Sequence, residues 1–163
     1  MSFIAESRRN VAVSPEALFD RLVDHASWRG WMPRSFIPVG SLLGELRVGD
    51  ALKVRIAGAP VATPIRVSVV DRPREIAWCG GVKRLLWAEH RFLFEPDGRG
   101  GTNVRSVETW EGALASAARR IVQPMAERIG REQLEALARS VEGAVLLRPA
   151  SPRGSRTRPT PEG

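Results

Sequence analysis

The sequence predicts an α+β fold in which a curved antiparallel sheet of six to seven strands grips a long C-terminal helix. Three observations lead to this prediction. Two short helical segments follow the first strand, segments with a period of two run from residue 36 to residue 111, and a helical period returns from residue 125 onward. Because one helix against a concave sheet leaves a space between them, the same pattern predicts an internal cavity.

The first two elements are a strand and a capped helix. Residues 3–13 alternate between apolar and polar side chains, which indicates a strand. Ser14 then has the properties of an N-cap, Pro15 suits the first helical position, and Glu16 favours the positive end of the helix dipole. The apolar face of this helix is formed by Leu18, Phe19 and Leu22.

A second short helical turn carries Trp28 and Trp31. Side chains three residues apart share one face of a helix, so we expect both indole rings on the same side before Pro33 ends the turn. His25 precedes this turn, next to Asp24, and is interpreted as an exposed turn residue.

The middle of the chain has the alternation of half-buried strands, separated by turns at residues 71–74 and at the glycine-rich residues 97–101. On the last three strands the inward positions are predicted to be Ile76, Trp78 and Gly80, then Leu86, Ala88, His90, Phe92 and Phe94, then Val104, Ser106, Glu108 and Trp110. Cys79 and Trp87 point outward in this pattern. We expect Cys79 to be an inert thiol. An outward Trp87 is a candidate contact with a second copy of the chain in a homodimer.

The C-terminal helix is predicted over residues 125–147, with Pro124 near its start. Its apolar stripe includes Leu134, Leu137, Ala138 and Val141. Its opposite face carries three oppositely charged pairs four residues apart, which is typical of a solvent-facing side: Glu127 and Arg131, Arg128 and Glu132, Glu135 and Arg139.

Composition places the chain among single soluble domains, with 163 residues, 43% apolar and 26% charged. We expect one domain over residues 1–147 and a disordered tail over residues 148–163, because that tail is rich in Arg, Pro, Gly and Ser and has almost no apolar side chain to bury. The tail carries +3 of the formal net charge of +7. The remaining +4 is modest, so we expect no nucleic-acid partner.

Several classes of site and location are disfavoured. No run of about 18 apolar residues and no secretory signal occurs, so we expect no transmembrane segment and, by default, a cytoplasmic location. The two histidines, His25 and His90, have no third ligand in the pattern, and Cys79 is a lone cysteine. No phosphate-binding loop or dinucleotide motif is present. We therefore expect no metal and no cofactor.

At this point the sequence resembles the START-related (SRPBCC) superfamily of polyketide cyclases, aromatases, lipid carriers and pollen-allergen-like ligand binders. The motifs that carry the resemblance are Val13-Ser-Pro-Glu-Ala-Leu-Phe-Asp20, Trp28-Arg-Gly-Trp-Met-Pro33, Val48-Gly-Asp50, Arg74-Glu-Ile-Ala-Trp-Cys-Gly80, His90-Arg-Phe-Leu-Phe-Glu95, Gly101-Thr-Asn-Val-Arg105 and Glu108-Thr-Trp-Glu-Gly112. The resemblance covers nearly the whole domain. It implies a helix-grip fold with a ligand cavity, and it does not distinguish a carrier from a cyclase.

Glu108 and His90 are the candidate catalytic residues, because both fall in the inward set on adjacent strands. A buried carboxylate must be paired or neutralised, so we expect a contact from Glu108 to His90 or to an arginine. Burial is expected to move the pKa values of both toward working pH, as a general acid and base would require. The alternative is a purely structural hydrogen bond.

Candidate ligand-binding residues are the inward aromatic side chains and their neighbours, because aromatic rings offer a large apolar area at low entropic cost. They are Trp28, Trp31, Trp78, Phe92, Ser106, Trp110, Leu137 and Val141. For Trp78 and Trp110, the cavity wall and ordinary core packing remain open alternatives.

Three functions are consistent with the sequence. The first is a non-catalytic carrier or sensor of a hydrophobic small molecule such as a lipid, quinone or polyketide. The second is a cyclase, aromatase or dehydratase in which Glu108 and His90 transfer protons. The third is a module that binds a partner protein through a sheet edge or the basic tail.

Overall fold

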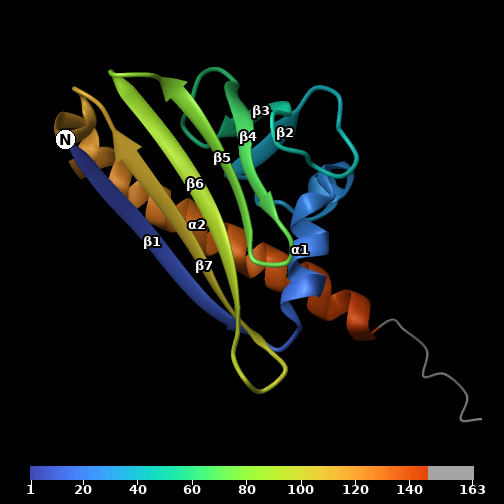
Figure 1. The fold of residues 1–163 in the computed structure, drawn as a ribbon. Coiled ribbons are helices and arrows are strands. Elements are labelled where there is room, and N and C mark those ends of the chain that lie inside the picture. Colours follow the sequence, from blue (N-terminus) through green and yellow to red (C-terminus); the bar gives the residue numbers. More distant parts are fainter. Residues whose placement is uncertain (147–163) are drawn as a thin grey trace, which may run out of the picture.

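The computed structural model describes residues 1–146 as a curved sheet with a long helix across one face (Figure 1). The predicted disordered tail at 148–163 lies outside the described residues. In chain order the elements are β1 (Ser2–Val11), α1 (Pro15–Val23), the 3₁₀ helix η1 (His25–Gly30), β2 (Phe36–Val39), β3 (Ala51–Ile56), β4 (Thr63–Asp71), β5 (Glu75–Val82), β6 (Leu86–Pro96), β7 (Thr102–Glu111) and α2 (Ala115–Leu146). The predicted α+β helix-grip architecture is confirmed.

All pairings in the seven-stranded sheet are antiparallel, and the strand order is β1-β7-β6-β5-β4-β3-β2. Each strand from β2 to β7 lies beside its neighbour in sequence. The exception is β1, which pairs with β7 from Ser2 opposite Glu111 to Val11 opposite Thr102. Helix α2 runs along the face of β1 and β7 and past α1 (Figure 1).

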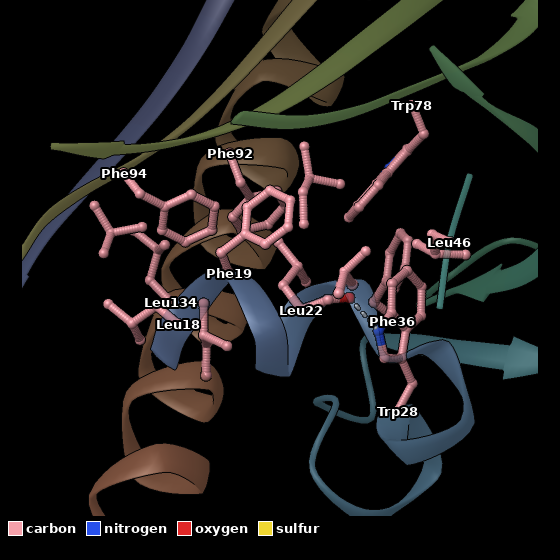
Figure 2. Close-up of a cluster of buried hydrophobic side chains, with 14 of the residues drawn as sticks. Leu18, Phe19, Leu22, Trp28, Phe36, Leu46, Trp78, Phe92, Phe94 and Leu134 are labelled. Carbon is pink, nitrogen blue, oxygen red and sulfur yellow. Dashed lines mark hydrogen bonds between the residues drawn. The ribbon is translucent and has the colours of Figure 1, made fainter. Parts of the chain in front are cut away.

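Helix α1 begins as the sequence predicts. The Ser14 side chain accepts a hydrogen bond from the Ala17 N–H at 3.4 Å, and Pro15 occupies the first turn. Its apolar face is buried together with two phenylalanines of β6 and one leucine of α2. Figure 2 shows Leu18, Phe19, Leu22, Phe92, Phe94 and Leu134 in this cluster. This end of the molecule is therefore a solid core.

Helix α2 begins at Ala115, ten residues before the predicted start. The added segment is rich in Ala and Arg, which favour helix, but it has no apolar stripe, so the period of apolar residues could not reveal it. Pro124 lies inside the helix. Proline has no N–H, so the Arg120 carbonyl loses its helical hydrogen-bond partner at position 124. Both residues are exposed, so water can satisfy that carbonyl. On the outer face, Arg128–Glu132 and Glu135–Arg139 form ion pairs.

His25 is buried, contrary to the interpretation of an exposed turn residue. Only 2% of it is exposed, and its Nδ1 accepts a hydrogen bond from the Leu43 N–H at 2.9 Å. The cause is the segment after β2, which folds back over η1. There the His25 N–H donates to the Gly44 carbonyl, and the Leu46 N–H donates to the Val23 carbonyl. No local sequence pattern predicts that the segment after β2 folds back over η1.

The two tryptophans of the turn have different environments. Trp28 is fully buried, with its Nε1 donating to the Leu22 carbonyl at 2.9 Å (Figure 2). Trp31 lies just beyond η1, where the backbone leaves the helical conformation, and it is only half-buried with its Nε1 donating to Ser27 Oγ. The expected common face for both rings is therefore only partly kept. None of the helices within residues 1–146 has the length and apolarity to cross a membrane.

Candidate functional site

A cavity of about 410 Å³ lies toward the end of the sheet where β5 turns into β6 and β7 leads into α2. Its walls come from β2 to β7 and from the loop before α2, and most of them are apolar. The aromatic rings of Phe36, Trp78 and Trp110 form part of the wall. The polar side chains along it are Thr63, His90 and Glu108. An apolar molecule with one polar end therefore fits this environment.

The inward alternation of β6 and β7 places the polar groups. His90 and Glu108 are direct partners across the two strands, as are Ala88 and Trp110. Side chains at directly opposed positions lie on the same face with Cβ atoms about 5 Å apart. The sequence-predicted inward set of these strands is confirmed, and its members closest to the β5–β6 turn are the ones that border the cavity.

Two loops meet at the exposed end of the cavity, here called its mouth, where the lining residues Leu85 and Leu114 are 45% and 46% exposed. The Ala113 N–H donates to the Arg84 carbonyl and the Leu114 N–H to the Leu85 carbonyl, both at 2.9 Å. Gly112 has a φ of +121°, and a Cβ there would lie 2.5 Å from the Leu85 carbonyl oxygen. Only glycine fits this position, so the junction depends on Gly112.

Burial raises the pKa of Glu108 from its ordinary value to about 7. The Trp110 indole opposes this shift, although its N–H forms no hydrogen bond of regular geometry with the described residues. Glu108 is half-buried, and it borders the cavity beside Trp110. Near neutral pH it can therefore give up or accept a proton at low cost.

His90 is 6% exposed, and burial lowers its pKa to about 3. Its Nε2 lies 2.7 Å from Ser106 Oγ, so its hydrogen bond goes to Ser106 and not to Glu108. The expectation that burial would move both pKa values toward working pH holds for Glu108 and is wrong for His90. Desolvation disfavours the charged form of each group, which raises the pKa of an acid and lowers that of a base. His90 is a neutral imidazole at working pH.

The predicted ligand-binding residues fall into two groups. Trp78 and Trp110 border the cavity, as do Glu108 and His90. The others lie away from it, in the buried core or beside it: Trp28, Trp31, Phe92, Ser106, Leu137 and Val141. The C-terminal half of α2, which carries Leu137 and Val141, packs on the solid end of the molecule. The cavity lies at the other end, near the start of α2.

Sequence reasoning missed part of the cavity wall. Leu86 and Ala88 were in the inward set and could have been selected as wall residues from their place near the β5–β6 turn. Leu85 and Leu114 lie in loops, where no periodic pattern marks an inward side chain. Leu85 and Leu114 come together only through the backbone hydrogen bonds between residues 84–85 and 113–114 at the mouth.

The outward residues have ordinary environments. Burial raises the pKa of the Cys79 thiol, and its Sγ contacts the Arg66 carbonyl, which suits an unreactive side chain. The Lys83 ammonium lies 5.4 Å from the centre of the Trp87 ring, so that ring is partly covered by its own chain. Contact of Trp87 with a second copy stays a prediction. Within the described part of the chain, no three His, Cys, Asp or Glu side chains are grouped as metal ligands.

Comparisons with known proteins agree with this architecture. The model of the family described as "Polyketide cyclase / dehydrase and lipid transport" matches residues 2–142. Among curated protein sequences, none matches significantly.

Three solved structures illustrate the similarity in fold. The Zhui aromatase/cyclase from Streptomyces sp. R1128 is 14% identical with a TM-score of 0.71, and the match covers 89% of this chain and 96% of that one. Norcoclaurine synthase from Thalictrum flavum, in complex with dopamine and hydroxybenzaldehyde, is 14% identical with a TM-score of 0.66, covering 93% and 90%. The protein TTHA0849 from Thermus thermophilus is 17% identical with a TM-score of 0.64, covering 87% and 99%. At these identities the likeness establishes the fold alone.

Proposed function

The chain belongs to the polyketide cyclase/dehydrase and lipid transport family, and on that premise we propose that it binds a hydrophobic small molecule in the cavity, as a carrier or sensor. The ligand would be a lipid, a quinone or a polyketide-like compound. Its apolar body would lie against the aromatic and aliphatic wall, with its polar end at Glu108 and His90.

The cavity itself carries this proposal. It offers about 410 Å³ within mostly apolar walls, and its polar side chains are few: His90 and Glu108 are cross-strand partners, and Thr63 lies apart on β4. Such a combination is typical of sites that bury most of a small ligand and fix its orientation through a few polar contacts. Two solved structures of the same fold are those of an aromatase/cyclase and of a synthase bound to dopamine and hydroxybenzaldehyde.

Filling the cavity tests the proposal. Ala88 borders the cavity, whereas Glu89 is the next residue on β6 and points to the other face. We expect Ala88→Phe to abolish the fluorescence enhancement of 1-anilinonaphthalene-8-sulfonate and to remove any small molecule seen by native mass spectrometry. Glu89→Phe should leave both unchanged. Equal binding by Ala88→Phe and the wild type would show that the probe binds elsewhere and would contradict the proposal.

A second candidate function is acid–base catalysis on an enolisable carbonyl compound. The observation that favours it is Glu108, which borders a mostly apolar cavity and whose pKa burial raises to about 7. These are the properties of a general base that can remove a proton next to a carbonyl. Because His90 is neutral, Glu108 alone would carry the proton in this mechanism.

Proton exchange tests this second function without knowledge of the natural substrate. In D₂O, the wild type is expected to accelerate exchange of the α-protons of α-tetralone, followed by proton NMR. Glu108→Gln should lose this acceleration while still binding the fluorescent probe. Equal exchange rates with the wild type and with Glu108→Gln would remove Glu108 from the role of base.

A further inference from the structure

We infer that the Ser106 hydroxyl holds His90 in the tautomer with its proton on Nδ1, so that the cavity contains a fixed, uncharged N–H donor beside Glu108. The site then selects an apolar ligand whose polar end carries an uncharged acceptor oxygen, such as a ketone carbonyl. The choice of ligand rests on the proposed binding function, whereas the tautomer of His90 does not. Ser106 is a positioning residue in this arrangement because it acts through His90.

The hydrogen bond between the two side chains has one assignment that satisfies both the Ser106 hydroxyl and His90 Nε2. Ser106 is 3% exposed, and His90 Nε2, at 2.7 Å, is its side-chain partner within residues 1–146. If Nε2 carried the proton and donated it, the Ser106 O–H would remain in the interior without an acceptor, which costs free energy. If the Ser106 O–H donates to Nε2, both groups are satisfied and the ring proton lies on Nδ1.

Helix α2 encloses the Ser106 hydroxyl at Gly130. A Cβ at position 130 would lie 2.9 Å from Ser106 Oγ and 3.3 Å from Ser7 Oγ, so the helix backbone comes as close as a glycine allows. Ser7 is the cross-strand partner of Ser106, but its own hydroxyl donates to the Glu127 carbonyl at 2.9 Å. Ser7 is therefore engaged with the helix, and Ser106 with His90.

The second ring nitrogen, Nδ1, is the one that remains for a ligand. His90 is part of the cavity wall, and the hydrogen bond to Ser106 uses Nε2, so Nδ1 has no hydrogen-bond partner among the described residues. The ring lies between two aromatic side chains, with centroids 4.6 Å from Phe92 and 5.3 Å from Trp78, which limits its rotation. A neutral Nδ1–H in this position can donate a hydrogen bond to a ligand oxygen. It cannot accept one, so it does not bind a ligand group that is only a donor.

Nitrogen NMR of the full chain decides the tautomer directly. The chain contains two histidines, so His25→Asn in a ¹⁵N-histidine-labelled sample leaves the signals of His90 alone. We expect Nδ1 to give the shift of a protonated nitrogen and Nε2 that of an unprotonated one, without change between pH 5 and pH 8. A proton on Nε2 in this sample would overturn the inference without any further variant.

Ser106→Ala and Ser7→Ala then form a matched pair, since each removes one hydroxyl from adjacent strands under the same helix. Ser106→Ala should shift the His90 signals toward a mixture of the two tautomers, and Ser7→Ala should leave them in place. Equal changes in both variants would show that general packing sets the tautomer and that Ser106 does not.

Binding of α-tetralone and of tetralin, which lacks the carbonyl, tests the ligand class. α-Tetralone should shift the His90 Nδ1–H signal and bind Ser106→Ala roughly fivefold more weakly than the wild type, the value of one neutral hydrogen bond. Tetralin should bind both proteins equally. If Ser106→Ala weakened the binding of both compounds equally, the Nδ1–H of His90 would not select the ligand. Failure of both to bind the wild type would contradict the proposed function, and the NMR result would still decide the tautomer.

Discussion

At the scale of single residues, the interior separates two titratable groups that the sequence presents as a pair. Glu108 and His90 are cross-strand partners, yet each is governed by its own desolvation. Glu108 becomes a carboxyl group that titrates near neutral pH, and His90 becomes a neutral imidazole held by Ser106. The two residues therefore have different chemical roles in the same cavity.

His25 has a structural role that substitution can measure. It is buried and supplies the acceptor for the Leu43 N–H. His25→Ala should lower the free energy of unfolding by about 2–4 kcal/mol, because it leaves a cavity and an unpaired N–H. His25→Asn should cost less, since its Oδ1 can replace Nδ1 as the acceptor. Urea unfolding checks both, and equal losses would show that the hydrogen bond to Leu43 contributes little.

The alternation of side chains predicted which residues of β6 and β7 point inward, including Glu108, His90 and Ser106. It could not predict their partners, because a period of two specifies a face and not a rotamer. It also could not separate the cavity wall from the core. Trp78 and Trp28 are both buried aromatic residues in contact with each other, and only Trp78 borders the cavity.

At the scale of elements, helix α2 shows which boundaries a sequence can reveal. The amphipathic part from residue 125 onward was predicted, and two of the three predicted charged pairs form ion pairs on its outer face. The first ten residues of the helix were not, since they carry helix-favouring residues without an apolar stripe. The loop junction at the cavity mouth was also beyond prediction, because it depends on contacts between segments almost thirty residues apart.

Two glycines of α2 should respond in opposite ways to the same substitution. Gly143 has open space around it, so Gly143→Ala should stabilise the protein by about 0.5 kcal/mol through helix propensity. Gly130 faces Ser106 and Ser7, and Gly130→Ala should cost about 1–2 kcal/mol because the helix must move away from the sheet. Denaturant unfolding measures both. If Gly130→Ala stabilised the protein, the helix and the sheet would not be in tight contact at Gly130.

At the scale of the whole molecule, stability should depend on pH through opposed contributions. Folded His90 has a pKa of about 3 against 6.5 for an ordinary histidine, so stability rises with pH up to about 6.5. Folded Glu108 keeps its proton up to a pKa of about 7, whereas an ordinary glutamate loses it near 4.5, so stability falls across that interval. The contributions of His90 and Glu108 to the slope therefore oppose each other between about pH 4.5 and pH 6.5.

We therefore expect the melting temperature of the wild type to rise less steeply with pH up to about 6.5 than that of Glu108→Gln, and to fall slightly from there to about pH 7.5. Glu108→Gln removes the falling contribution, so its melting temperature should rise up to about pH 6.5 and then stay constant, above that of the wild type at pH 8. Differential scanning calorimetry between pH 4 and pH 9 checks this. Parallel curves for the two proteins would contradict the raised pKa of Glu108.

The pairing of β1 with β7 has a consequence for how the chain folds. Ser2 lies opposite Glu111, so β1, the first strand of this sheet in chain order, pairs with β7, the last. Until then Phe3 and Ala5, which are buried in the finished sheet, face water. Closing so long a loop is entropically costly, and contacts this distant in sequence slow folding. A nascent chain therefore carries β1 as an unpaired, half-apolar strand until β7 has been made, and this strand is where misassociation would begin.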